Sequence, residues 1–558
     1  MKQMVVVNQM GHTVYYDADN TSFEMGSLSG SQLHAMEQQL SDLFGDEGVA
    51  FREMRRGTLL MVMERIDGYP TMVCSDEGDS AALLRQQARL AHAIFRMIVG
   101  EDAYDAKKRS NKNLWGHIPR MVPLVRAMSK LTHRQQPFLV EATEKMILNE
   151  QNGGLLREMI EEPCKEHAPD SAHALLFVGS KLAADWTRDS TQQLNPKDIV
   201  LINLIRSAAL RPELTRPPDG ALAKARQRLE WAKSGHQRLG LPWRLVEPKL
   251  VDQIGALLLG NASEAMSRRV EEEQQRAFDM ESGTDSSSLY SSGEAASETI
   301  KVLHVTLDGK RAVRCHIFVG VVDRSTSLVV VSPCVAASAD KASEQRKRAM
   351  STGASSRAGR VSDETRAIYS KVLEMFTQKY EGCGLDTYLP VQAAAHVTML
   401  KYLSRFPGLV HFIFVDRSTN EVVAPRITSL GHPAGEKTPA EQRDAARLKN
   451  KIWEMYGVAK HCQREGYDLL TMREGEFCYA CRLWHEESKS GDEVPPSTEG
   501  DDDFLTNLRS IFKPGSLFGR EQTKQLELYT IHLASLPAAA IAATNTRLLE
   551  MLRDGGHA

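Results

Sequence analysis

Residues 406–425 carry the most regular hydrophobic pattern in the chain, FPGLVHFIFVDRSTNEVVAP. Every residue of 410–415 except His411 is apolar, at odd and even positions alike. A strand with one wet face alternates apolar and polar residues, so this run predicts a strand buried on both faces in the middle of a sheet. The side chains of 416–420 predict a tight turn, because Asp, Ser, Thr and Asn bond to nearby backbone. A second strand then ends at Pro425, since proline cannot donate to a β-ladder.

The same pattern of two strands and a helix is predicted at two other places. Residues 4–17 and 174–186 each contain two apolar runs separated by turn residues. Helices are expected after the three hairpins, at 31–44, from 195 and from 438, and each has a typical start: a capping box or an Asn or Thr cap followed by proline. Two alternatives remain open, because strand–turn–strand–helix patterns also recur by chance and the alanine-rich second copy is compatible with one helix.

The residues that follow each unit complete a sheet. After the first predicted helix come three short strands, at 49–54, 58–65 and 71–74, and then a helix over 81–99 with Gly100 at its C-terminal cap. The sequence therefore predicts an α+β protein built from five-stranded antiparallel sheets flanked by helices. We expect three such domains, each with its own packed interior.

The second and third units are less regular. Residues 211–299 form a polar insertion that we expect to be largely disordered towards its end, because it has too little apolar material to pack. Strands resume at 301–307, 311–322 and 327–335, and a helix follows at 363–380. In the third unit strands are predicted at 468–474 and 477–484, then an acidic loop, and its fifth strand is left open. Helices are predicted for the tail, over 504–512, 522–535 and 538–553.

These patterns suggest three domains. The first covers 1–150, with trailing helices. The second covers 171–385, interrupted by the insertion, and the third covers 395–558 with the C-terminal helices. A chain of 558 residues is too long for one core, which agrees with several domains.

Composition excludes some classes of function. The chain has 69 Lys and Arg against 72 Asp and Glu, so bulk attraction to nucleic acid is not expected. No run reaches the roughly 20 apolar residues that a membrane-spanning helix needs. The N-terminus lacks a signal-peptide pattern, which predicts a cytoplasmic protein. The 8 cysteines are scattered, so no disulfide framework is expected in that compartment.

Three short motifs were weighed as functional sites. Cys478 and Cys481 form a lone CxxC, but they lie on a predicted strand, where positions i and i+3 face opposite sides, so buried structural cysteines are favoured over zinc. Two identical DRST stretches, 323–326 and 416–419, lie at predicted hairpin tips and indicate turn chemistry. A basic stretch around 346–348 is compatible with peripheral contact to anionic lipid or with a solvated loop.

No covalent catalysis is predicted. The chain has no P-loop, no GxSxG elbow, no HExxH and no paired carboxylates at a recognisable spacing. We therefore predict no catalytic residues, no cofactor and no metal site.

The ordered series of units resembles the family of Fuzzy, Mon-one and Hermansky–Pudlak type-one proteins, which are built from three longin domains. The resemblance is carried by 406–425, by LKNKIWEMYGVAKHCQREGYDLLTMREGEFCYACRLWHE at 448–486, by 173–205, and by ELYTIHLASLP at 527–537. It spans most of the chain, is strongest in the C-terminal third, and is weakest across 211–299. The Hermansky–Pudlak branch is the most similar.

The resemblance implies a subunit of the third biogenesis-of-lysosome-related-organelles complex. Its partner would be a Hermansky–Pudlak type-four-like longin protein. Together the two would act as a guanine-nucleotide exchange factor that promotes GDP release from a Rab GTPase of lysosome-related organelles, such as melanosomes. The chain would be cytoplasmic and transiently present at organelle or vesicle membranes.

The resemblance also implies where the partner or the GTPase would bind. First longin domains of related exchange factors pair through their first helix and the strand that follows it. Here these segments are 31–44 and 49–54, and the implied interface residues are Leu33, Met36, Leu40, Phe51 and Met54. Packing of the three helical residues on their own sheet is the alternative for them.

Other functions stay open from the sequence. A non-catalytic effector or scaffold would bind the GTP-loaded Rab and leave the release rate unchanged. A Mon-one-like or Fuzzy-like subunit would instead serve trafficking or polarity. A zinc-dependent enzyme is the remaining alternative, which metal analysis of the purified protein would test.

Overall fold

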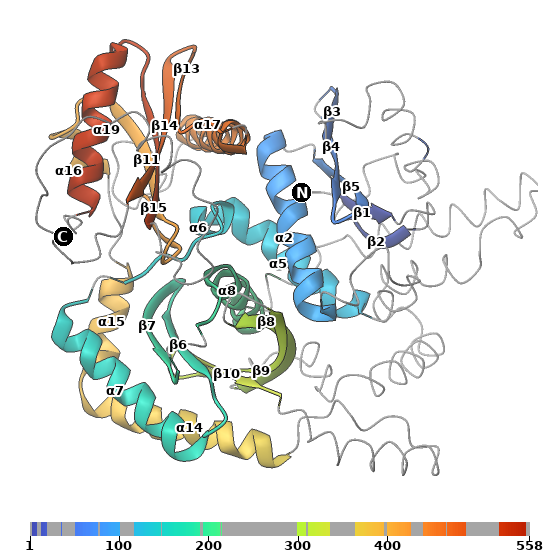
Figure 1. Cartoon of the computed structure of the whole chain (residues 1–558), viewed down its shortest axis with the longest axis vertical. Coiled ribbons are helices and arrows are strands. Elements are labelled where there is room, and N and C mark those ends of the chain that lie inside the picture. Colours follow the sequence, from blue (N-terminus) through green and yellow to red (C-terminus); the bar gives the residue numbers. More distant parts are fainter. Residues whose placement is uncertain are drawn as a thin grey trace, which may run out of the picture. The chain divides into compact units, whose positions relative to one another are not determined.

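The computed structural model describes seventeen stretches of the chain, and the description below is confined to them (Figure 1). They are residues 3–7, 13–18, 35, 51–57, 59–75, 79–100, 117–146, 148–189, 193–211, 214, 298–307, 311–334, 363–394, 399–425, 439–464, 466–486 and 524–553.

The first sheet forms from the N-terminal strands. Its strand order is β2-β1-β5-β4-β3, and every neighbouring pair is antiparallel. The strands are β1 (Gln3–Val7), β2 (Thr13–Ala18), β3 (Phe51–Arg56), β4 (Leu59–Ile66) and β5 (Tyr69–Ser75). Helix α2 (Ala81–Val99) follows; the Ser80 hydroxyl accepts a hydrogen bond from the Leu83 N–H at 3.2 Å, and Gly100 ends the helix with a φ of 88°.

The second sheet repeats this order as β7-β6-β10-β9-β8. Its strands are β6 (His173–Val178), β7 (Lys181–Thr187), β8 (Glu298–Leu307), β9 (Arg311–Val321) and β10 (Thr326–Pro333). Residues 174–186 are therefore two strands rather than one helix. Helix α8 (Pro196–Leu210) begins at an Asn195 cap with proline in its first turn, as predicted.

Further helices surround the first two sheets. Between the sheets in the chain lie α5 (Ile118–Arg134), α6 (Gln136–Leu139) and α7 (Glu150–His167), and after the second sheet come α14 (Asp363–Gly382) and α15 (Leu385–Ala394). Figure 1 shows α7 and α14 on one face of the second sheet and α8 on the other.

The third sheet has the order β12-β11-β15-β14-β13, and all its neighbouring strands are antiparallel. Its strands are β11 (Leu409–Asp416), β12 (Glu421–Val423), β13 (Leu469–Glu474), β14 (Phe477–Glu486) and β15 (Lys524–Leu533). The associated helices are α16 (Met399–Leu403), α17 (Pro439–Arg464) and α19 (Ala538–Arg553).

One tail prediction is wrong. Residues 524–533, expected within a helix over 522–535, form β15, the central strand of the third sheet. Leu526, Leu528 and Ile531 are all at most 1 % exposed, because both faces of this strand are covered. A short segment with apolar residues on both faces fits a buried helix as well as a buried strand, so periodicity does not distinguish the two here. The helix predicted over 538–553 is present as α19, and the one over 504–512 lies outside the described residues.

The protein is thus an α+β protein with three five-stranded antiparallel sheets of identical strand order. The recurrence predicted from the sequence is confirmed at this level. The three sheets fall within the predicted ranges 1–150, 171–385 and 395–558, while the boundaries themselves stay a prediction. The polar insertion over 211–299 lies almost entirely outside the described residues.

The expectation of three separate interiors is wrong. Side chains of the first sheet, such as Val62 and Val73, belong to the same buried cluster as Leu303 and Val305 of the second sheet, and α2, α5 and α8 contribute to it as well. The first two sheets therefore share part of their buried interior. The chain divides into two compact units: Met1–His396 with Arg426–Val458, and Val397–Pro425 with Ala459–Ala558.

Candidate functional site

The residues predicted for a partner interface fall partly within the described structure. Phe51 and Met54 lie on β3, and the Met54 residue is 42 % exposed. Leu33, Met36 and Leu40 lie outside the described residues. The interface itself stays a prediction for all of them.

Strand β3 is an edge strand, because it stands last in the order of its sheet and pairs only with β4 among the described strands. Arg56 pairs with Leu59 across the turn at Gly57, so the backbone groups of Glu53 and Arg55 point away from β4. The Arg55 guanidinium lies 3.0 Å from the Glu53 carboxylate, and Arg85 of α2 lies 3.5 Å from it. Charged side chains on an edge strand oppose unspecific pairing with other strands. A partner strand with complementary charges could still pair with this edge.

The chain itself covers much of the equivalent edge in the second sheet. Arg120 of α5 donates to the carbonyl of Val302 on β8 at 3.1 Å. The N–H of Thr306 donates to the Asp198 carboxylate at 2.6 Å, and the Thr306 carbonyl accepts from the Asn195 N–H at 3.0 Å. These contacts fill outward-facing backbone groups of β8 that an added strand would need.

The opposite edge of the second sheet is covered as well. The N–H of Leu182 on β7 donates to the Glu144 carbonyl at 2.9 Å, and the Leu182 carbonyl accepts from the Met146 N–H at 2.8 Å. Residues 144–146 thus run alongside β7 as a short extra strand. At these points the chain itself occupies the edges of the second sheet. The edge strands β3 and β13 of the first and third sheets instead carry exposed residues, such as Met54 and Leu469.

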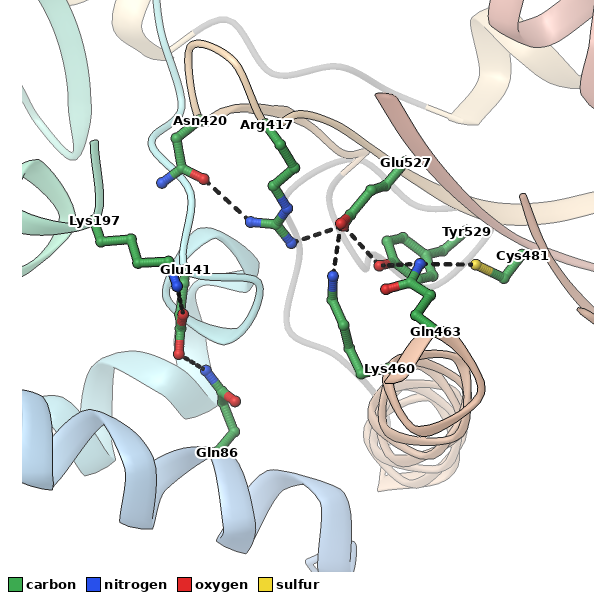
Figure 2. A network of polar contacts seen from close by, with 10 residues as sticks. All are labelled: Gln86, Glu141, Lys197, Arg417, Asn420, Lys460, Gln463, Cys481, Glu527 and Tyr529. Carbon is green, nitrogen blue, oxygen red and sulfur yellow. Dashed lines mark hydrogen bonds and ion pairs between the residues drawn. The ribbon is translucent and has the colours of Figure 1, made fainter. Parts of the chain in front are cut away.

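A polar cluster in the second unit is centred on a buried carboxylate, Glu527 of β15 (Figure 2). Its side chain is 2 % exposed. Arg417 and Lys460 each lie 2.7 Å from one of its two oxygens, and the Tyr529 hydroxyl donates to it at 2.7 Å. Figure 2 also shows the contacts that extend the cluster: Arg417 to Asn420, and Gln463 to Tyr529 and Cys481.

Burial and neighbouring charges shift the pKa values of two groups in this cluster, Glu527 and Lys460. Burial would raise the pKa of Glu527, but the hydrogen bond and charge of Arg417, together with Lys460, outweigh it and hold that pKa below its usual range. Burial and the nearby Arg417 lower the pKa of Lys460, against the attraction of Glu527. We interpret the cluster as a structural lock, because it fastens the turn after β11 and the end of α17 to the central strand.

A second polar contact group lies within the first unit (Figure 2). The Gln86 amide of α2 donates to Glu141 at 2.6 Å, and Lys197 of α8 approaches the other Glu141 oxygen at 3.9 Å. Glu141 has a φ of 51° in the loop that follows α6. The contacts connect α2 and α8 through the loop that follows α6, in a partly exposed position.

Two of the three short sequence motifs lie within the described residues and have structural roles, whereas the basic stretch around 346–348 lies outside them. Cys478 and Cys481 lie on β14 and face opposite sides of the sheet, as predicted: Cys478 packs with Ile541 of α19, and Cys481 accepts from Gln463 of α17. Burial raises the pKa of the Cys481 thiol to about 12, so it is a poor nucleophile at neutral pH.

Both DRST motifs form the predicted turns. The Asp323 carboxylate accepts from the backbone N–H groups of Ser325 and Thr326, at 2.6 and 2.7 Å. The Asp416 carboxylate accepts from the Ser418 N–H at 2.9 Å. The two turns lie at different places in their sheets, between β9 and β10 and between β11 and β12, so their identity reflects turn chemistry rather than a shared ligand site.

The sequence analysis does not predict the Glu527 cluster. Its carboxylate lies on β15, a segment that the sequence analysis assigns to a helix, and its partners lie 110 and 67 residues away along the chain. The only local signal is one acidic residue between Leu526 and Leu528, in a segment that is otherwise largely apolar.

In the part of the chain that the structure describes, no helix is long and apolar enough to cross a membrane. The same residues contain no group of three or more His, Cys, Asp or Glu side chains that could hold a metal ion. No family model matches the sequence.

Proposed function

We propose that this chain is a Hermansky–Pudlak type-one-like subunit of a heterodimeric exchange factor. With a type-four-like longin partner it would promote GDP release from a Rab GTPase during biogenesis of lysosome-related organelles. The observation that carries the proposal is the strand order of the three sheets, which is the same each time. The resemblance implies three longin domains, one after another along the chain. The three five-stranded antiparallel sheets agree with that expectation and support membership of the tri-longin family.

The chemistry that the proposal requires is modest. An exchange factor breaks no covalent bond; it binds the nucleotide-free GTPase more tightly than the loaded one, and by linkage it weakens nucleotide binding by the same factor. A weakening of about a thousandfold corresponds to about 4 kcal/mol of differential binding. An interface of ordinary size can supply that amount without a specialised catalytic side chain.

The first sheet is the proposed contact region, with the segment of Leu33, Met36 and Leu40 and the strand of Phe51 and Met54. Strand β3 is placed at the end of its sheet, and its exposed Met54 offers an apolar contact beside charged neighbours. Pairing of this edge with a partner strand would extend the sheet across both subunits.

The direct test is nucleotide release. The chain is co-expressed with the type-four-like partner, and loss of a fluorescent GDP analogue from candidate Rabs is followed. We expect the complex to accelerate release from one Rab of lysosome-related organelles by orders of magnitude. A stable complex that leaves release from every Rab unchanged would favour a scaffold or effector, and acceleration on an endosomal Rab instead would favour a Mon-one-like role.

The proposed edge has its own test. Phe51→Asp is expected to abolish co-purification of the partner, because a charge would be buried where the proposal places an apolar contact. Leu155→Asp is the matched control, since Leu155 is a 37 % exposed apolar residue on α7 and its replacement should leave binding intact. Full retention of the partner by the Phe51 variant would place the interface elsewhere.

A further inference from the structure

Strand β13 of the third sheet has outward-facing backbone groups that bind nothing in the described structure. The Asp468 carbonyl accepts from the Leu483 N–H, and Glu474 pairs with Phe477 across a two-residue turn. In an antiparallel pair such positions alternate, so the backbone N–H and C=O groups of Leu469, Thr471 and Arg473 point away from β14. Among the described residues nothing bonds to these groups.

This edge also exposes apolar side chains. Leu469 is 64 % exposed and the preceding Tyr467 is 63 % exposed. On the other face of the strand, Leu470 and Met472 are half-buried, and Leu533 of β15 beyond Phe477 is 45 % exposed. Apolar contacts therefore flank the unpaired backbone on both faces, which suits an added strand whose side chains alternate.

The charges around β13 indicate the chemistry of such a strand. Asp468 and Glu476 are exposed beside its two ends. The cation on this strand, Arg473, is turned aside: its guanidinium donates to the carbonyls of Ala534 and Leu536 at 2.8 and 2.6 Å. The accessible charge near the edge is thus mainly negative, and a complementary strand would carry Lys or Arg.

Comparison within the molecule strengthens the inference. The equivalent strand of the second sheet, β8, has its outward groups at Val302 and Thr306 occupied by the chain itself. The outward-facing backbone groups of β13 are covered by no described residue, although exposed edges are normally covered or charged.

We propose that β13 is a docking edge for an extended basic and apolar segment of a partner protein, which adds a sixth strand to the third sheet. This surface differs from the edge of the first sheet, and the inference does not depend on the exchange-factor proposal. Backbone hydrogen bonds to Leu469, Thr471 and Arg473 would provide the affinity, and the acidic side chains would select basic segments.

The test is amide hydrogen exchange of the full chain, resolved to single residues by fragmentation in a mass spectrometer. The probe is a synthetic peptide of alternating lysine and valine, and a peptide of alternating glutamate and valine is the control. With about nine-tenths of the chain occupied, exchange at Leu469, Thr471 and Arg473 should slow about tenfold, because only the free fraction exchanges. The glutamate peptide should have no effect.

A paired substitution tests the backbone contact. Thr471→Pro removes one outward N–H without removing a bond to β14, so it should abolish the protection while Leu470 and Met472 remain slow to exchange. Thr471→Val keeps the N–H and should bind the lysine peptide as the natural chain does.

Several outcomes would overturn the proposal. They are no slowing with either peptide, equal slowing with both, or unchanged peptide protection in a folded Thr471→Pro variant. Slow exchange of the three amides without any peptide would also overturn it. If that protection depended on protein concentration, the occupant would be a second copy; if it did not, the occupant would be the chain itself.

Discussion

Replacing Glu527 with Gln is expected to destabilise the third sheet by about 3–5 kcal/mol, the range found when one partner of a buried ion cluster is removed. The amide would leave Arg417 and Lys460 facing each other without a neutralising charge, in a position where the carboxylate is 2 % exposed. Amide hydrogen exchange of β14 and β15 measures the stability of the third sheet itself, so the result does not depend on the stability of the first unit.

The matched control lies on the same helix as Lys460. Lys451 and Glu454 form an ion pair at 2.9 Å, but their side chains are 29 % and 37 % exposed, so Glu454→Gln should cost less than about 1 kcal/mol. Adding Lys460→Met to Glu527→Gln should recover part of the loss, because it removes one of the uncompensated charges. Similar exchange rates for the Glu527 and Glu454 variants would contradict the structural role proposed for the cluster.

Acid is expected to destabilise both units through two buried histidines. Burial lowers the pKa of His92, with a further contribution from Arg96, and burial lowers that of His411, each from 6.5 to about 3. Both are therefore neutral in the folded chain at pH values where the unfolded chain takes up a proton. Stability is fully present above pH 6.5 and should fall by about 1.4 kcal/mol per pH unit for each histidine, down to about pH 3.

Single substitutions separate the two contributions. His92 packs beside Tyr69 and Phe95, and its Nε2 lies 2.7 Å from the Thr71 hydroxyl, so His92→Gln keeps a neutral polar group at that position. The variant should lose some stability at pH 7 but show a shallower pH dependence between 6.5 and 4.5 in the first unit alone. His411→Gln should do the same in the second unit. Stability is measured by amide hydrogen exchange, with exchange times corrected for the pH dependence of the chemical exchange rate. If stability depended on pH as steeply in both variants as in the natural chain, the two histidines would not be the cause.

Local patterns were enough to find most elements. The turn residues after β11 and the asparagine and proline before α8 act over a few positions, so their effect is visible in a short stretch of sequence. The repeat itself was also readable, since two strands joined by a turn begin each of the three sheets; the first predicted helix, over 31–44, lies almost entirely outside the described residues. The placement of Cys478 and Cys481 on opposite faces of β14 followed from the period of a strand.

The sequence by itself thus determined the α+β class, the repeated hairpins and the helices α2, α8, α14, α17 and α19, because capping, turn and periodicity signals are local. The tertiary structure alone decided which strand occupies the centre of the third sheet, since β15 is apolar on both faces and resembles a buried helix. It also decided that the first two sheets share a core and that Glu527 meets Arg417 and Lys460. Those contacts join residues far apart in the chain, and no short-range pattern encodes them.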